Sequence, residues 1–204
     1  PLKILPLDIR IENAPAAFVT YIIKTFWPHN LAIFYPYPTH MPLWKIFGSS
    51  LLIILITTCV IFVMKHLPYF YVGWFWYAIS IAPVMGFIQI SAYSMADHYH
   101  YLPSIGIAIM LAWGIPLLFK NKMSCKDILL SIAIVFLVTM TLLSWRQCRY
   151  WENSLKIFRH SLQVTQNNTM MHNLIGYELS EKGNFVEAIY YFNRAIMIAP
   201  DYVY

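Results

Sequence analysis

The sequence predicts an all-α fold in which about four transmembrane helices precede the start of an α-solenoid. Of the 204 residues, 59% are hydrophobic and only 11% are charged, which lies outside the range of ordinary soluble domains. Four uncharged stretches are each long enough to cross a hydrocarbon core of about 30 Å. They lie near residues 46–64, 70–92, 101–119 and 128–145. After residue 145 the chain becomes rich in charged and amide side chains, with the apolar period of a soluble helix.

Residues 1–45 are predicted to be an exterior, interfacial segment rather than a span, because seven prolines interrupt an otherwise apolar stretch. We expect a short helix lying at the surface over residues 16–27, ended by Pro28. The aromatic side chains of this segment are expected at the level of the lipid headgroups. They are Trp27, Tyr35, Tyr37 and Trp44.

Residues 46–145 form the predicted transmembrane domain, with short turns at residues 66–68 and 121–126. With four spans, the loop over residues 92–100 lies on the same side of the membrane as the interfacial segment and the C-terminal part. The turns on the other side favour the cytoplasm by the positive-inside rule, since they carry Lys65, Lys120, Lys122, Lys126 and the single acid Asp127. Basic residues after the last span oppose this orientation and leave it open: Arg146, Arg149, Lys156 and Arg159.

The net charge of +5 is scattered over the membrane edges and forms no compact basic patch, so we expect membrane lipid and no nucleic acid as a partner. The three cysteines show no disulfide or metal-ligand spacing. They are Cys59, Cys125 and Cys148.

Residues 169–202 match the pattern of a tetratricopeptide repeat, a pair of antiparallel helices. The residues at the positions where the pattern packs or turns are Gly176, Gly183, Phe185, Ala188, Phe192, Ala195 and Pro200. A step of 34 residues back from this pattern predicts a degenerate half-repeat over residues 146–168, with Ser154, Phe158 and Ser161 in equivalent places.

The chain is expected to be a fragment of a longer protein. It begins without an initiator methionine or a signal peptide, in residues typical of a loop in mid-course, so we expect the N-terminal half to be missing. Roughly three or more repeats are needed for a stable solenoid. Further repeats are therefore expected after residue 204, and the repeats together would bind a protein partner or acceptor.

The candidate site is the loop SMADHYHYLPSIG, residues 94–106, which lies between uncharged stretches. Asp97 is its only formally charged residue. An ionisable group kept at membrane depth is costly without a partner, which makes it a functional candidate. His98 and His100 are candidate partners, because either could share a proton or hold a phosphate oxygen near neutral pH.

Three other interpretations of this loop remain open. Tyr93, Tyr99 and Tyr101 could form an aromatic belt while Asp97 only caps the next helix. A divalent metal is possible through the loop histidines with His29 and His40, but the carboxylates are few and the spacing is weak. The exposed aromatic rings could also stack on sugar rings.

Three segments carry a resemblance to a known family: YIIKTFWPHNLAIFYPYP, ADHYHYLPSIGIAI and RQCRYWENSLKIFRHSLQVTQNN. With the repeat that follows, they resemble bacterial polytopic membrane proteins with C-terminal tetratricopeptide repeats. These are similar to the eukaryotic transmembrane and tetratricopeptide-containing O-mannosyltransferases. The resemblance covers nearly the whole chain in the same order, and the Tyr-Leu-Pro-Ser of the loop is its most specific part.

The resemblance implies a glycosyltransferase of the GT-C architecture, which transfers a sugar from a polyprenyl-phosphate carrier on the outer or luminal face of a membrane. It also implies that the catalytic base lies in an earlier exterior loop outside this chain. The family's acid-Arg-Tyr loop falls on Asp97, His98 and Tyr99, followed by Tyr101 within Tyr-Leu-Pro. His98 departs from the usual arginine, so phosphate binding is expected to be weaker or more pH-dependent, with Arg10 or Lys24 assisting.

The expected function is therefore transfer of a sugar from a polyprenyl-phosphate carrier to a protein hydroxyl or glycan by a multi-pass membrane protein. The carrier-binding residues would be Asp97, His98, Tyr99, His100 and Tyr101. No cofactor is evident beyond the lipid-linked sugar donor. The expected location is the bacterial inner membrane or the endoplasmic reticulum, with the repeats on the exterior or luminal side. The alternatives are a non-enzymatic membrane scaffold that displays the repeats, and a ligase or polymerase of surface polysaccharide.

Overall fold

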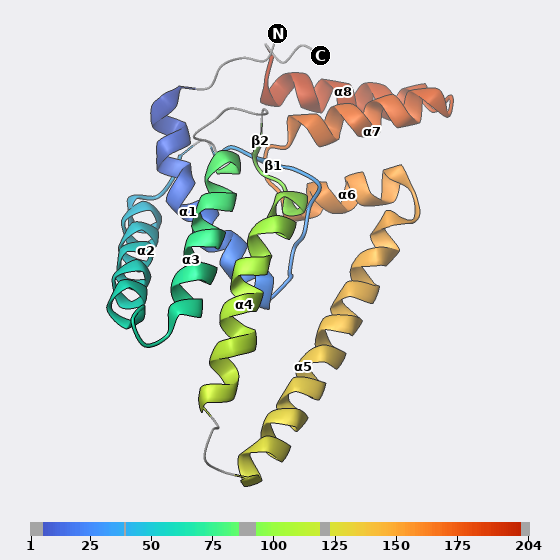
Figure 1. The fold of residues 1–204 in the computed structure, drawn as a ribbon. Coiled ribbons are helices and arrows are strands. Elements are labelled where there is room, and N and C mark those ends of the chain that lie inside the picture. The colour runs from blue at the N-terminus through green and yellow to red at the C-terminus, as the bar shows by residue number, and fades with distance from the viewer. Residues whose placement is uncertain (1–5, 39, 86–92, 119–122, 201–204) are drawn as a thin grey trace.

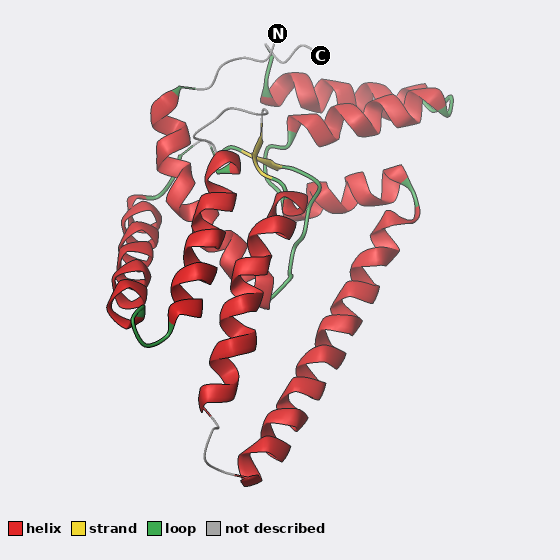
Figure 2. Cartoon of the chain, viewed as in Figure 1, coloured by secondary structure: helices red, strands yellow, loops and turns green. Residues whose placement is uncertain are grey.

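The structure, a computed structural model, describes residues 6–38, 40–85, 93–118 and 123–200, without the side chains of residues 118 and 123–127. Over these ranges helices dominate, and two short antiparallel strands pair with one another (Figure 2). The all-α prediction is confirmed. The elements are α1 (Leu7–Phe26), β1 (Tyr35–Pro36), α2 (Leu43–Val63), α3 (Pro68–Ile81), the 3₁₀ turn η1 (Ala82–Val84), β2 (Tyr93–Met95), η2 (Asp97–His100), α4 (Tyr101–Leu118), α5 (Met123–Cys148), η3 (Arg149–Glu152), α6 (Ser154–Val164), α7 (Thr169–Glu181) and α8 (Phe185–Ile198).

Among the residues that the structure describes, three helical segments are long and apolar enough to cross a membrane, judged by length and composition. They are Leu43–Val63, Asp97–Leu117 and Ile128–Glu152. Their large apolar side chains are mostly exposed, as with Phe62, Trp113 and Leu137, which suits contact with lipid. The predicted spans at residues 46–64, 101–119 and 128–145 thus coincide with candidate membrane helices.

The described residues hold three candidate spans, against a prediction of about four, and the predicted span 70–92 is described only in part. In the predicted span 70–92, α3 has only 14 residues and continues as η1. Such a helix rises by about 21 Å at 1.5 Å per residue, short of a core of about 30 Å. Pro83 has no N–H to extend the α-helical hydrogen bonds, so the helix tightens into a 3₁₀ turn there. Residues 86–92 lie outside the described residues.

Helix α1 is longer and more deeply packed than the surface helix predicted over residues 16–27. It begins at Leu7, runs through Pro15, and ends at Phe26, just before Trp27 and Pro28. One face is buried, with Tyr21 and Ala17 each only 1% exposed. Phe18 on this face makes edge-to-face contacts with Trp74 and Tyr77 of α3. This packing overrides the loss of one backbone hydrogen bond at Pro15.

Helices α3 and α4 cross where two glycines meet. A Cβ on Gly73 would collide with the Gly106 carbonyl, and one on Gly106 would collide with the Gly73 carbonyl and lie 2.9 Å from the Tyr77 nitrogen. Small residues let membrane helices approach closely, so dispersion contacts and the backbone itself form the interface. The crossing fixes the start of α4 and therefore the position of η2, which carries Asp97.

The C-terminal helices α6, α7 and α8 pack in sequence. Ile175 and Leu179 of α7 and Ala188 of α8 form their core, and a Cβ on Gly176 would lie 2.7 Å from the Phe192 ring. Gly183 separates the two helices with a φ of +78°, a conformation that glycine adopts without strain. The seven packing positions of the predicted repeat divide into two groups. Gly176, Ala188 and Ala195 are buried and Phe192 is partly buried, whereas Gly183, Phe185 and Pro200 are exposed.

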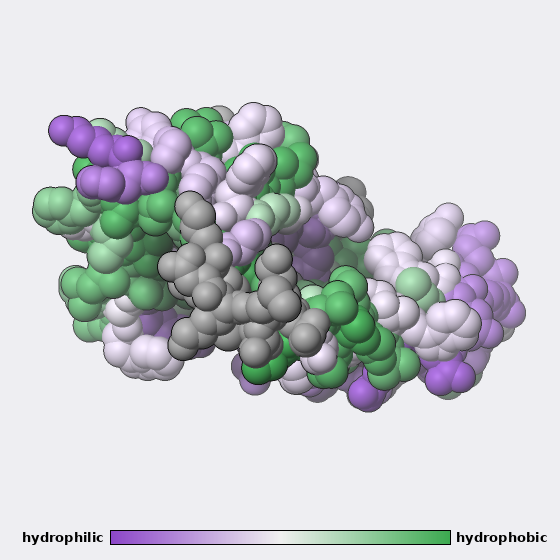
Figure 3. Space-filling view, turned by 60° about the horizontal axis from the view of Figure 1, so that its bottom comes forward, coloured by the Kyte–Doolittle hydropathy of each residue, from purple (hydrophilic) through white to green (hydrophobic). Residues whose placement is uncertain are grey.

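The candidate loop and the C-terminal helices lie at the same end of the long helices (Figure 1). The turn between α2 and α3 lies at the opposite end, as do the end of α4 and the start of α5. Lys120 and Lys122 of that connection lie outside the described residues, as do the side chains of Lys126 and Asp127. Figure 3 shows hydrophobic side chains over much of the face formed by the long helices, and hydrophilic ones around the projecting tip of the α7–α8 pair.

Replacing Gly106 by Ala should destabilise the protein. The added methyl must displace the Gly73 backbone, and overpacking of this kind costs about 1–3 kcal/mol of unfolding free energy. The measurement is reversible unfolding in mixed micelles. Gly48→Ala is the matched control, since nothing lies within 4 Å of a Cβ at Gly48. An equal loss of stability in both variants would contradict the close crossing.

Candidate functional site

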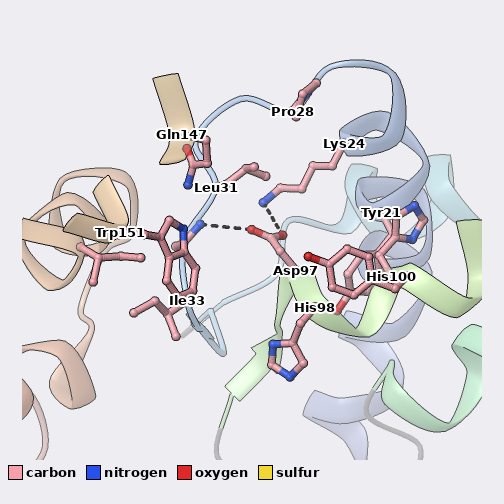
Figure 4. A pocket seen from close by; sticks show the side chains of 13 residues that line it. Tyr21, Lys24, Pro28, Leu31, Ile33, Asp97, His98, His100, Gln147 and Trp151 are labelled. Atoms are coloured by element: carbon pink, nitrogen blue, oxygen red, sulfur yellow. Dashed lines mark hydrogen bonds and ion pairs between the residues drawn. The ribbon is translucent and has the colours of Figure 1, made fainter. Parts of the chain in front are cut away.

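A pocket of about 320 Å³ opens beside the loop that the sequence singled out (Figure 4). Its walls come from the end of α1, from residues 28–33, from η2 with the start of α4, and from the junction of α5 with η3 and α6. The polar side chains that line it are Lys24, Asp97, His98, His100 and Gln147. The pocket therefore lies where the membrane helices meet the C-terminal helices.

Asp97 is held by donors from two other parts of the chain. Its Oδ1 lies 3.2 Å from Lys24 Nζ on α1. Its Oδ2 accepts hydrogen bonds from the Ala32 backbone N–H at 3.2 Å and from the Tyr35 hydroxyl at 2.8 Å. Lys24 Nζ also donates to the Tyr35 oxygen, and the ring of Tyr35 lies under the ammonium. The carboxylate thus joins α1, the segment before β1, and η2.

Burial strengthens this interaction. The side chains of Lys24 and Asp97 are only 14% and 26% exposed, so solvent screens the pair weakly. Burial lowers the pKa of Lys24, and the charge of Asp97 opposes that shift. Burial and the same charge raise the pKa of Tyr35, which therefore remains a neutral phenol and a hydrogen-bond donor.

The backbone before β1 is shaped to deliver these donors. Asn30 adopts a φ of +53°, which asparagine tolerates better than most residues, and turns the chain back on itself. Its carbonyl lies 3.1 Å from the Tyr35 hydroxyl, so the turn is closed by the same phenol that contacts Asp97. The Ala32 N–H is thereby shared between the Tyr35 hydroxyl oxygen at 2.7 Å and the Asp97 carboxylate at 3.2 Å.

The other residues of the candidate loop divide between the pocket and its surroundings. His98 is exposed at the pocket, with its ring 4.3 Å from that of Tyr99. His100 lines the pocket too, with Nε2 2.5 Å from Thr25 Oγ1 and its ring stacked on Tyr21. Tyr101 is 79% exposed at the pocket edge. Tyr99 is not among the lining residues and hydrogen-bonds Tyr93 instead.

In the structure Asp97 does not pair with His98 or His100, the partners expected from the sequence. The hydrogen bonds of its carboxylate go to Lys24, Ala32 and Tyr35 rather than to the loop histidines. The alternative that Asp97 caps the next helix is not realised either, because Ala96 occupies the cap position of η2 without a side-chain cap. Arg10, which was expected to assist, is not among the pocket-lining residues.

Two aspects of the pocket were missing from the sequence predictions. Gln147, in the last turn of α5, and Trp151, in η3, face the Lys24–Asp97 pair across the pocket (Figure 4). The sequence does contain a signal for the pairing of Lys24 with Asp97, because each is the only charged residue in a long apolar stretch. Among the residues that the structure describes, no group of three or more His, Cys, Asp or Glu side chains is placed to hold a metal ion.

A double-mutant cycle over Lys24→Met and Asp97→Asn should reveal strong coupling. Each single change leaves a partly buried group without its partner and should cost about 1–3 kcal/mol of unfolding free energy. The double variant should lose less than the sum, with a coupling of roughly 0.5–3 kcal/mol. The measurement is again reversible unfolding in mixed micelles. The exposed pair Lys156–Glu152 is the control and should show little coupling, and additive losses for Lys24 and Asp97 would refute the interaction.

Comparison with known proteins finds similarity to O-mannosyltransferases. The chain is 24% identical over 127 residues to Protein O-mannosyl-transferase Tmtc3 of Drosophila melanogaster, and this match covers 62% of the chain and 14% of that protein. It is 27% identical over 128 residues to human Protein O-mannosyl-transferase TMTC3, covering 61% and 13%. It is 31% identical over 98 residues to human Protein O-mannosyl-transferase TMTC4, covering 48% and 13%.

These matches span only a small part of each relative, about one seventh of its length. No protein-family profile matches the chain, and no solved structure matches it significantly. The relatives named here are animal proteins, so the expected bacterial origin stays a prediction. Together with the three candidate spans, the similarities support the resemblance of this chain to membrane-bound protein O-mannosyltransferases.

Proposed function

We propose that this chain belongs to an integral-membrane glycosyltransferase that moves a sugar from a polyprenyl-phosphate carrier to a protein hydroxyl or glycan. The observation that carries the proposal is the pocket beside Asp97, which combines an oriented ammonium with apolar walls at the end of the candidate spans. The similarity to O-mannosyltransferases supports mannose as the sugar to test first.

In this proposal Lys24 is the main donor to the carrier phosphate. An ammonium has three N–H donors, and those of Lys24 that face Asp97 and Tyr35 leave one for a phosphate oxygen in the pocket. Asp97 orients the ammonium, and its charge and hydrogen bond oppose the lowering of the Lys24 pKa by burial. His98, His100 and the amide of Gln147 lie around the same space and supply weaker donors.

An apolar groove supports a lipid tail as the other half of the ligand. A cavity of about 460 Å³ lies between Phe26 and Trp27 on one side and α5 on the other. Its α5 wall ends at Met140, seven residues before Gln147 of the pocket, or about 10 Å along a helix. A carrier with its phosphate beside Lys24 would extend its hydrocarbon chain along this wall toward the lipid.

The proposed chemistry is displacement at the anomeric carbon, with the departing phosphate stabilised by Lys24 and its neighbours. Asp97 is not assigned as the general base, because three donors already occupy its two oxygens. We assign that base to a carboxylate outside the described residues. The exposed faces of Trp151 and Tyr101 are suited to stack on the sugar ring. Helices α6–α8 would begin an exterior or luminal tetratricopeptide array that binds the acceptor protein.

Polyprenyl-phosphate binding to the full-length protein in nanodiscs tests the proposal. Lys24→Gln should weaken binding about tenfold to a hundredfold, the loss of a charge-assisted hydrogen bond of roughly 1.5–3 kcal/mol. His98→Arg should retain or improve binding, since a guanidinium is a permanent, bidentate phosphate donor.

Transfer of mannose from polyprenyl-phosphate mannose to an acceptor is measured in the same variants. Lys156→Gln is the control, because that lysine is exposed and pairs with Glu152 outside the pocket. Unchanged binding in Lys24→Gln, or a clear loss in His98→Arg, would count against the phosphate site. Unchanged transfer in Asp97→Asn would show that the loop around Asp97 does not contribute to catalysis.

A further inference from the structure

Residues 30–35, here called the wall loop, are held by the C-terminal helices as well as by Asp97. The Ile33 backbone N–H donates to Ser161 Oγ of α6 at 3.4 Å. Asn168 Nδ2, just before α7, donates to the Phe34 carbonyl at 3.2 Å. His160 of α6 hydrogen-bonds the Leu31 backbone. Contacts from α6 and from the residue before α7 therefore fall on three of the four loop residues 31–34.

The same loop forms the pocket wall. Leu31, Ala32 and Ile33 line the pocket, and the Ala32 N–H reaches Asp97 between the residues that Ser161 and His160 hold. Ile157 of α6 is itself a lining residue and is only 6% exposed. The first C-terminal helix is thus part of the pocket rather than an attachment to it.

Asn168 differs from the other asparagine caps of this region. Asn153, Asn168 and Asn184 each begin a helix with a side-chain oxygen that accepts a backbone N–H. Asn153 and Asn184 make their cap contacts at exposed positions, and the amide of Asn184 donates to nearby Glu187. Asn168 is only 3% exposed, and its amide reaches Phe34, 134 positions away in the chain.

We infer that Ser161 and Asn168 are positioning residues for the lipid-phosphate pocket. They fix the wall loop, and the loop in turn presents the Ala32 N–H and the Tyr35 hydroxyl to Asp97, which orients Lys24. A shift of α6 and α7 is transmitted to the phosphate donor through these contacts. Occupancy of the pocket and the placement of the acceptor-binding helices are therefore coupled. This inference rests on the proposed function for the identity of the ligand, whereas the contacts themselves do not depend on it.

Asn168→Asp separates positioning from capping. The carboxylate keeps an oxygen for the Met171 N–H and so preserves the cap, but it cannot donate to the Phe34 carbonyl. Ser161→Ala removes the acceptor of the Ile33 N–H in a second, uncharged variant. Asn184→Asp and Asn153→Asp are the matched controls, since they make the same change at caps that do not contact the wall loop.

Two measurements on the full-length protein in nanodiscs decide the inference. Amide hydrogen exchange of residues 31–35 without ligand should be faster in Asn168→Asp and Ser161→Ala than in the wild type. Affinity for polyprenyl phosphate should fall roughly threefold to tenfold in both, the effect of one neutral hydrogen bond. The two control variants should match the wild type in both measurements.

Exchange rates equal to the wild type in both pocket variants would overturn the inference, and so would the same changes in the controls. Faster exchange with unchanged affinity would also overturn it, because the loop would then be held without positioning the ligand. If the wild type does not bind polyprenyl phosphate, the proposed function fails, and the exchange comparison alone decides whether α6 and α7 hold the wall loop.

Discussion

The ion pair between Lys24 and Asp97 is the interaction on which the candidate site depends. The two residues lie 73 positions apart, and each is the only charged residue in its apolar stretch. A charge in such surroundings is stable only with a partner, so each residue offsets the cost of burying the other. The Tyr35 hydroxyl and the Ala32 N–H satisfy the remaining oxygen of the carboxylate. The pocket exists because this one cluster fixes α1, the wall loop and η2 against each other.

Packing within the membrane domain places the cluster at the end of the long helices. Tyr21 exchanges hydrogen bonds with the Ala96 backbone, and Tyr77 donates to the Phe18 carbonyl. These buried contacts tie α1 to α3 and to the residue before Asp97. The glycine crossing of α3 and α4 then sets the direction in which α4 leaves the site. Helix α5 lies apart from this packing, which leaves the apolar groove open on the side of Trp27.

Sequence patterns predict the long helices well and single out a loop that lines a pocket, but they predict poorly which side chains pair with one another. Long apolar runs fix α2, α4 and α5, because length and hydropathy alone decide a candidate span. They place the helix bounds less well at α3, which Pro83 ends early, and at α1, which tertiary packing extends through Pro15. Asp97 was recognisable from its isolation in the chain. Its partners depend on how α1 folds back against η2, which is a tertiary contact that no local spacing reports.

Chemical crosslinking between Thr25→Cys and His100→Cys tests the central claim most directly, because Thr25 Oγ1 lies 2.5 Å from His100 Nε2 and both members of the Lys24–Asp97 pair stay in place. The double variant is made in full-length protein whose other cysteines, including Cys59, Cys125 and Cys148, are replaced by serine, and is treated with a short bismaleimide in native membranes. The account predicts efficient intramolecular crosslinking. Lys65→Cys with His100→Cys is the control, since Lys65 follows α2 at the opposite end of the helices, and it should not crosslink (Figure 1). Failure of the first pair to crosslink, or equal crosslinking of both pairs, would contradict the arrangement of the site.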